Sequence, residues 1–313
     1  MENEKLFNGY DPRFLIDEAI IDEVALPILN DDQNDDAVKI GDTSVIKYVN
    51  YSLQLSIAHK FPYYTASNID GILFKKVPRK DNWRKDRRIQ EFQWGKELYS
   101  AANSDFDRGH MTKREDVQWG NTIGLALKAA DSTFYYSNAV PQHKDLNRDI
   151  WKSLEDYILN TETKPKSLRI SVFTGPVLAS SNPFFVTPIN GASVQIPIVF
   201  WKIVVFPKDD GQIYRVGFMM SQNRLLEEHG IIEEVEAATS DEDLFMKFDD
   251  AATYQVNISL IEELTGLTMP KAIDPYTDKR SKRLVLKEID IDPELESDSI
   301  EQRLGFIIEN LTL

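Results

Sequence analysis

Residues 133–155 read TFYYSNAVPQHKDLNRDIWKSLE, and this stretch predicts a strand, a loop and a helix in succession. Its aromatic start favours a strand over Ser132–Asn138. Further on, residues 147–159 repeat apolar side chains at the spacing of one helical face, at Ile150, Trp151, Leu154 and Ile158. The helix is therefore expected to turn this stripe toward a hydrophobic core.

Asn147 is a polar residue at the start of that stripe. It precedes Trp151, Leu154 and Ile158 by four, seven and eleven residues, so its amide is expected to point inward with them. A buried amide needs a partner. Its oxygen could coordinate a hard cation, and a helix N-cap would satisfy it as well. Glu155, at the margin of the stripe, could orient water around a metal or pair with a surface lysine.

Residues 105–111, DFDRGHM, hold the histidine with the most suggestive setting among His59, His110, His143 and His229. Gly109 allows the backbone to turn or to approach a neighbour closely. Arg108 places a cation two residues from His110, which suits a phosphate and favours a neutral imidazole. A neutral imidazole can act as a general base. A structural histidine in a turn is the alternative interpretation of these residues.

The remaining pattern is that of an α+β protein in which sheet dominates. Runs rich in Val, Ile, Tyr and Thr predict strands at 45–57, 63–73, 168–175, 196–206 and 212–220. A helix is predicted over Ser259–Leu267, ending at Gly266.

The two ends of the chain read as extensions of a central domain over 46–277. Residues 1–45 form an acidic extension, in which the run at 31–36 is expected to be a solvated loop. Residues 278–313 form a second extension, in which an apolar stripe predicts an amphipathic helix from Asp298 onward. That helix could pack on its own domain or bind a partner.

The net charge of −15 argues at first against a nucleic-acid enzyme, because phosphate contacts need lysine and arginine. The charge is unevenly placed, with −9 in residues 1–45 and −7 in residues 288–313, which leaves about +1 between them. Within that middle region, residues 75–88 carry eight basic side chains against two acidic ones. A local surface for phosphates is therefore compatible with the overall charge.

Composition excludes several classes of site. No apolar run approaches the roughly 18 residues that a membrane span needs, and residues 1–5 lack the order of a secretion signal, which favours the cytoplasm. The 313 residues contain no cysteine, so a catalytic metal would need oxygen or imidazole ligands. Magnesium-like ions or zinc fit that requirement.

The combination of these motifs resembles the DNA/RNA non-specific endonuclease family over about residues 45–275. Each element alone is common, whereas the ordered series is specific. The series comprises Asp107-Arg108-Gly109-His110, Ser137-Asn138 with Pro141-Gln142, Leu146-Asn147 with Trp151 and Leu154-Glu155, and Phe173-Thr174-Gly175-Pro176.

The resemblance implies a central antiparallel sheet flanked by helices, with a ββα-metal (His-Me finger) motif at the active site. It implies that His110 is the general base and that Asn147 is the protein ligand of Mg²⁺, for which Mn²⁺ could substitute. Asn138 would orient the site, Glu155 would hold metal-bound water, and Arg108 would lie near the phosphate. For the phosphate-clamping arginine the first choice is Arg79, with Arg84 and Arg88 behind it.

The function expected from the resemblance is magnesium-dependent, sequence-nonspecific cleavage of DNA, RNA or both. One alternative is a module that binds nucleic acid or protein without catalysis. Another is an effector nuclease kept silent by its acidic ends or by a regulatory protein. A homodimer is compatible with all three.

Overall fold

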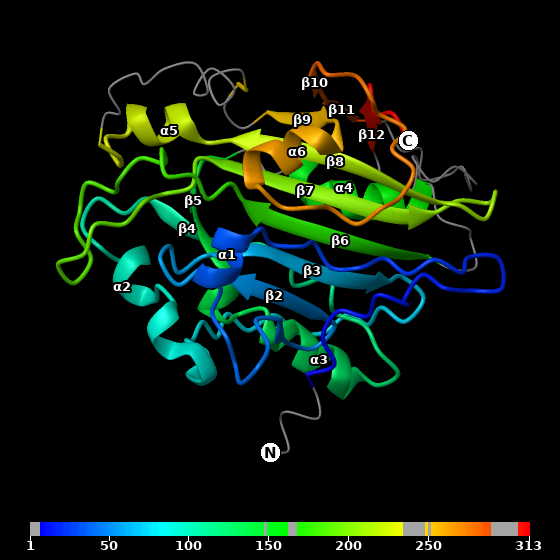
Figure 1. Cartoon of the computed structure of the whole chain (residues 1–313), viewed down its shortest axis with the longest axis horizontal. Helices are drawn as coiled ribbons and strands as arrows, with labels where there is room; N and C mark the ends of the chain where they lie inside the picture. Colours follow the sequence, from blue (N-terminus) through cyan, green and yellow to red (C-terminus); the bar gives the residue numbers. More distant parts are fainter. Residues whose placement is uncertain (1–6, 147–148, 162–167, 234–247, 250–251, 289–305) are drawn as a thin grey trace.

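The computed structural model describes residues 7–146, 149–161, 168–233, 248–249, 252–288 and 306–313. Its centre is an eight-stranded antiparallel sheet in the order β1-β2-β3-β6-β7-β8-β9-β10 (Figure 1). The strands of this sheet are β1 (Ile46–Lys47), β2 (Tyr51–Leu55), β3 (Pro62–Asp70), β6 (Arg169–Pro176), β7 (Val199–Pro207), β8 (Ile213–Ser221), β9 (Thr253–Val256) and β10 (Lys282–Arg283).

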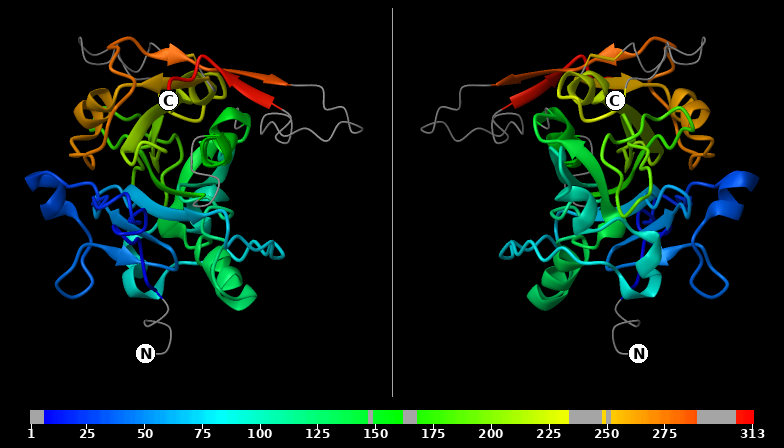
Figure 2. Two further views of the ribbon diagram at one scale, coloured as in Figure 1. Left: turned by 90° about the vertical axis from the view of Figure 1, so that its right-hand side faces the viewer. Right: turned by 90° about the vertical axis from the view of Figure 1, so that its left-hand side faces the viewer.

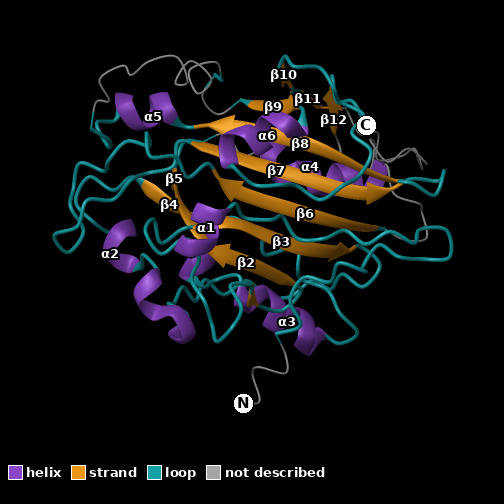
Figure 3. Cartoon of the chain, viewed as in Figure 1, coloured by secondary structure: helices purple, strands orange, loops and turns teal. Residues whose placement is uncertain are grey.

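Two smaller ribbons and short helices surround the sheet, as the colouring by secondary structure shows (Figure 3). The ribbons pair β4 (Phe106–His110) with β5 (Ala139–His143), and β11 (Val285–Glu288) with β12 (Phe306–Glu309). The helices are α1 (Asp31–Asp36), α2 (Lys96–Tyr99), α3 (Ile123–Ser132), α4 (Asp149–Thr161), α5 (Asn223–Glu228) and α6 (Ile258–Thr265), with 3₁₀ turns η2 (Arg87–Phe92) and η3 (Tyr136–Asn138). The expected α+β class with a central antiparallel sheet is confirmed.

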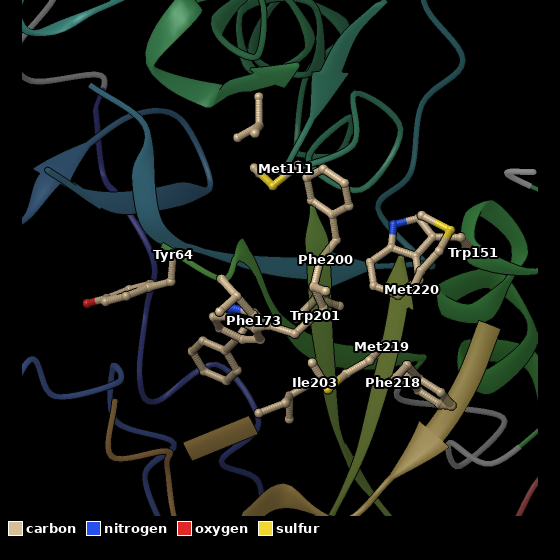
Figure 4. Packing of buried hydrophobic residues seen from close by; sticks show 14 of the residues in the cluster. Tyr64, Met111, Trp151, Phe173, Phe200, Trp201, Ile203, Phe218, Met219 and Met220 are labelled. Carbon is tan, nitrogen blue, oxygen red and sulfur yellow. The ribbon is translucent and has the colours of Figure 1, made fainter. Parts of the chain in front are cut away.

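The middle strands are apolar because both faces of the sheet are covered. Every residue of β7 is buried. Helix α4 lies on one side of the sheet, and α1 and α6 lie on the other (Figure 2). Aromatic and methionine side chains of β6, β7 and β8 fill the core, together with Met111 and Trp151 (Figure 4). Burying one such large side chain contributes about 1.5–3 kcal/mol.

The described part of the acidic N-terminal extension packs on this body. Tyr10, Leu15 and Val24 are buried in the main core, and Ile28 forms a β-bridge with Thr268. The solvated loop expected at 31–36 is wrong, since these residues form α1. Asn30 and Gln33 supply a reciprocal capping box that satisfies the backbone at the helix start. The domain boundaries at 45/46 and 277/278 stay a prediction.

The strand expected at Ser132–Asn138 is also wrong. Helix α3 continues to Ser132, and the Thr133 hydroxyl donates to the carbonyl of Ala130 at its end. The aromatic residues that follow serve as core side chains around the turn η3, with Phe134 and Tyr136 buried. The true strand, β5, starts where this expected one ended.

The helix expected from Asp298 onward is contradicted where the structure describes it. Residues 289–305 lie outside the described ranges, and Phe306–Glu309 form strand β12. Phe306, Ile307 and Ile308 favour extended structure, and they pair antiparallel with β11. Cross-strand pairing thus prevails over helical spacing here. None of the helices in the described ranges combines the length and hydropathy that a bilayer crossing requires.

Candidate active site

The candidate site is built on the ribbon β4–β5 and helix α4, which together make a ββα unit. The ribbon is antiparallel, with His110 opposite Ala139 and Gly109 opposite Val140. Gly109 lies in extended backbone and not in a turn, contrary to one of the expected readings. A Cβ atom added there would lie 2.3 Å from Cδ of Gln142, so glycine gives the glutamine side chain room to cross the ribbon.

His110 ends β4 with its imidazole held between aromatic rings. The ring centroids of Trp83 and Phe134 lie 4.6 and 5.1 Å from that of His110. The Nε2 atom is buried and has no hydrogen-bond partner in the part of the chain that the structure describes. Burial, and after it the Arg79 cation, lowers the pKa of His110 to about 4. The expected neutral imidazole thus owes its state to burial and Arg79, and Arg108 is not among the main causes.

Asn138 holds the backbone that leads away from His110. Its amide nitrogen donates to the carbonyls of Thr112 and Thr133, both at 3.0 Å, and its amide oxygen accepts the N–H of Thr112 at 2.9 Å. The backbone carbonyl of Asn138 accepts the N–H of Met111 as well. Asn138 is thus buried, holds the backbone of residues 111–112 and is absent from the lining of the cleft in front of His110.

A cleft of about 470 Å³ opens in front of His110. We call it the His110 cleft. Arg108 lies on the same face of β4 as His110. Its guanidinium carbon is 6.0 and 5.8 Å from the ring centroids of Trp83 and Tyr99, and its buried Nε has no hydrogen-bond partner among the described residues. The cleft is lined by Arg79, Asp81, Trp83, Asp107, Arg108, Gly109, His110, Met111, Lys113, Arg114, Glu115, Gln142, Trp151 and Lys202.

Of the three arginines considered for the phosphate clamp, only Arg79 lines the His110 cleft. Its Nε donates to Asp81 at 2.6 Å, and both side chains are exposed. Arg84 instead binds Asp131 at 2.6 Å, and Arg88 binds Asp86 at the same distance. Arg84 thus joins its segment to the end of α3, and Arg88 lies within η2, over the Phe7 and Tyr48 rings.

Glu155 is buried on α4 and forms an ion pair with Lys202 of β7. Lys202 also donates to the carbonyl of Trp151 at 3.0 Å. The other carboxylate oxygen, Oε2, is buried with no hydrogen-bond partner among the described residues. Nearby Asp116 has a pKa raised well above its usual value, mainly by burial and then by the charge of Glu155. One expectation from the sequence was that Glu155 would pair with a surface lysine. Its lysine partner, Lys202, is instead buried.

Asn147, the expected metal ligand, lies outside the described residues, which stop at Leu146 and resume at Asp149. The donor chemistry around the His110 cleft nevertheless fits a hard cation. Glu155 Oε2 is a carboxylate oxygen, the donor type that hard cations prefer, and it has no hydrogen-bond partner among the described residues.

Sequence reasoning missed several residues of the cleft. Gln142 appears above only as part of the Pro141-Gln142 motif without a role, and no local pattern assigns Trp83 or Lys202 to the site. Lys113 and Arg114 follow His110 by three and four residues, and their basic charge was the available signal.

Comparisons with known proteins agree with this geometry. The match to the family described as DNA/RNA non-specific endonuclease covers residues 33–275. An uncharacterised protein of Sinorhizobium fredii is 34% identical over 57% of this chain and 27% of its own length. Human mitochondrial endonuclease G is 30% identical over 41% of this chain and 45% of its own length. The chain thus spans less than half the length of these two relatives.

A nuclease of Serratia marcescens is 22% identical over 79% of this chain and 82% of its own length. Among solved structures, one of an EndoG/EndoGI complex, titled for the mechanism of EndoG inhibition, matches with a TM-score of 0.50 and 20% identity. It covers 73% of this chain and 86% of the other, a likeness that concerns the fold. Because the family match extends over most of the sequence and coincides with the ββα unit, the chain belongs to the DNA/RNA non-specific endonuclease family.

Proposed function

We propose that this protein is a magnesium-dependent endonuclease that hydrolyses phosphodiester bonds of DNA, RNA or both without sequence preference. The observation that carries the proposal is the His110 cleft, which is lined by both His110 and Arg108. His110 Nε2 and Arg108 Nε are buried there without a hydrogen-bond partner among the described residues. Family membership supports the reaction class.

His110 would act as the general base. With its pKa near 4 in the free protein, the imidazole is neutral at pH 7 and can accept a proton at Nε2. A bound phosphate adds negative charge, which raises the pKa and makes the base stronger when substrate is present. The proton moves from water to Nε2 as the water oxygen bonds to phosphorus. The bond from phosphorus to the 3′ oxygen then breaks, and that oxygen takes a proton from a solvent water, which leaves 5′-phosphate and 3′-hydroxyl ends. His110 later returns its proton to solvent.

Arg108 and Arg79 would hold the phosphate. Within the described part of the chain the Nε of Arg108 has no hydrogen-bond partner, so it can donate to a phosphate oxygen without losing one there. For Arg79, a phosphate would have to replace Asp81. Both cations would offset the charge that gathers on the reacting phosphate.

Asn147 would hold Mg²⁺, with Mn²⁺ as a substitute, and Glu155 would contribute a carboxylate near it. When bound, the metal would supply positive charge to the phosphate and to the leaving oxygen. Asn138 would act through His110 by fixing the backbone of Met111 and Thr112.

Low sequence preference follows from the lining of the cleft. Its basic side chains suit phosphates, and contacts to phosphates carry no sequence information. The proposed attack uses water and not the RNA 2′-hydroxyl, so one site could cut both nucleic acids.

A regulated nuclease is the second candidate. It is favoured by the solved relative, whose title concerns EndoG inhibition in a complex with EndoGI. A protein partner at the His110 cleft would have to satisfy the same cations as a phosphate. None of the described residues of the N-terminal extension lines this cleft, so self-inhibition by residues 7–45 gains no support.

The test is cleavage of plasmid DNA and of RNA by the purified chain with Mg²⁺, with EDTA, and in the variants His110→Ala and Asn147→Ala. We expect cleavage that is lost on chelation and in both variants. The matched control is His59→Asn, a histidine substitution at a residue outside the His110 cleft. Full activity of His110→Ala would exclude the proposed mechanism. An intact protein without activity would leave the regulated nuclease and the non-catalytic module.

A further inference from the structure

A group of side chains apart from the His110 cleft has the composition of a transition-metal site. The side chains are those of His143, Asp145 and His229, and one ligand atom from each lies within 4.8 Å of the others. We propose that these three residues bind a zinc-type divalent ion that ties the turn after β5 to the end of α5. The proposal does not depend on the proposed nuclease function.

The group is spatially separate from the candidate active site. His143 ends β5 opposite Phe106, while His110 lies opposite Ala139 at the other end of the same ribbon. Four residues along a strand span about 13 Å. The three residues of the group are absent from the lining of the His110 cleft. A metal held here would therefore lie apart from His110 and its cleft.

The elements that carry the two histidines are fixed to each other by a buried glutamine. Gln222, which directly precedes α5, accepts the backbone N–H of His143 at 2.8 Å. Its amide nitrogen donates to the carbonyls of Pro141 and Pro197 at 3.1 and 2.8 Å. The two imidazole centroids are 4.5 Å apart as a result of this arrangement. Ligands placed on fixed elements need little reorganisation to receive an ion.

His229 already has the orientation that metal-binding histidines show. Its Nδ1 lies 2.8 Å from the carbonyl oxygen of Leu225, one helical turn earlier. A carbonyl only accepts hydrogen bonds, so Nδ1 carries the proton and Nε2 keeps its lone pair. A second-shell carbonyl of this kind fixes the tautomer and ring direction of metal-ligating histidines.

His143 and Asp145 complete the donor set. The His143 Nδ1 atom lies 3.9 Å from Oδ2 of Asp145, and it accepts the Asp145 backbone N–H at 3.2 Å. The lone pair of this nitrogen therefore faces the turn that carries the carboxylate. To bind zinc, this lone pair would exchange the Asp145 N–H for the ion, and the donors would move to the distance of about 2.0–2.2 Å that zinc takes to nitrogen and oxygen.

The charges around the two rings favour a cation. The carboxylate of Asp145 lies beside the His143 ring, with its Oδ2 3.9 Å from Nδ1 of His143. The carboxylate of Asp105 also interacts electrostatically with both imidazoles, although its main partner is Lys144. Two carboxylates and one lysine thus face the pair of rings.

The donor types select the kind of ion. Two imidazoles and one carboxylate suit zinc and its neighbours in the transition series, whereas magnesium prefers oxygen ligands. Three protein ligands leave one position for water. Asp145 precedes Asn147 by two residues, so the ion would restrain the segment that leads into α4.

The test is zinc binding by the full-length, tag-free chain carrying Asn147→Ala, measured by calorimetry in excess Mg²⁺. The substitution removes the proposed catalytic ligand, so binding at that position does not contribute. We expect one Zn²⁺ per chain. His229→Asn and Asp145→Asn change exposed side chains and should each weaken binding by more than about tenfold. His59→Asn is the matched control and should bind zinc as the parent does.

A second measurement separates loss of the site from loss of folding. Zinc should raise the melting temperature of the parent and of His59→Asn, and should raise it less in the two site variants, while circular dichroism confirms that all are folded. No zinc binding by the parent, or equal weakening by His229→Asn and His59→Asn, would overturn the proposal. Neither result would bear on the nuclease reaction, which is tested by His110→Ala.

Discussion

The two ends of the ribbon β4–β5 each carry a histidine, and their surroundings differ. His110 is packed between the Trp83 and Phe134 rings and faces arginines, an environment suited to an anionic phosphate. His143 lies beside His229 and Asp145, an environment suited to a cation. The residue type and the strand pairing are the same at both ends. The two imidazoles therefore differ in burial against aromatic rings and in neighbouring charge, and these differences underlie the two distinct roles proposed for them.

Removing the base should produce the largest effect. His110→Ala is expected to lower kcat by about 10²–10⁴-fold, because proton transfer from the attacking water is lost. Zinc affinity should be unchanged if the two ends of the ribbon act separately. Cleavage kinetics and zinc calorimetry on the same preparation check both statements. A variant that loses zinc binding as well would show that the two ends are coupled.

Arg79 offers a test that combines rate and pH. Arg79→Ala should lower kcat by about 10²–10³-fold if it stabilises the reacting phosphate. The neutral form of His110 is the active one, so kcat/KM of the parent should hold as pH falls and decline near pH 4. Because the Arg79 cation depresses this pKa, its removal should move the decline to higher pH.

The pH dependence of cleavage and an NMR titration of the His110 ring measure that shift independently. Arg84→Ala is the control, since this arginine binds Asp131 outside the cleft. A decline that stays in place in Arg79→Ala would remove Arg79 from the electrostatics of the base.

Asn138 should matter through stability first. In Asn138→Ala, the N–H of Thr112 and the carbonyls of Thr112 and Thr133 lose their buried partner. An unsatisfied buried group costs about 1–3 kcal/mol, so the free energy of unfolding should fall by at least that amount. Denaturant unfolding measures it. A folded variant with normal stability but lost activity would instead mean that the amide touches the substrate.

Gly109→Ala should produce the smallest effect. Its new methyl group would collide with the Gln142 side chain, and overpacking of this kind costs about 1–3 kcal/mol, less where a flexible side chain can move. Combining it with Gln142→Ala should restore part of the lost stability. If the double variant is no more stable than Gly109→Ala, the role of the glycine lies elsewhere.

Most of the large sheet could be predicted from the sequence because its strands are long and rich in β-branched and aromatic residues. The ribbon that carries His110 could not, since DFDRGHM has neither the alternation nor the composition of a strand. Residues 106–110 are extended because they pair with β5. The aromatic residues before β5 had led to a strand being predicted too early, at Ser132–Asn138. Tertiary pairing, which local sequence does not encode, accounts for both errors.

The candidate site was predictable to the extent that it follows a family motif. His110, Arg108 and Arg79 line one cleft, whereas Asn138 and Glu155 are buried beside it. The ion pair between Glu155 and Lys202 joins residues 47 positions apart, and no local pattern signals such a contact. No local pattern signals the position of His229 either, which follows α5 and lies close to His143 and Asp145 at the end of β5.

The ion pair between Glu155 and Lys202 also determines when the site can be completed during protein synthesis. Lys202 reaches the cleft from the middle of β7, after the ββα unit is complete in the sequence. A nascent chain that ends at α4 therefore contains His110 and Glu155 but lacks the lysine that neutralises the buried carboxylate. The cleft can assume its final form only after more than 40 further residues have left the ribosome. By the time Lys202 has been added, the ribosome has translated β1, β2, β3, β6 and the start of β7. The finished cleft therefore cannot form near the messenger RNA at an earlier stage of translation.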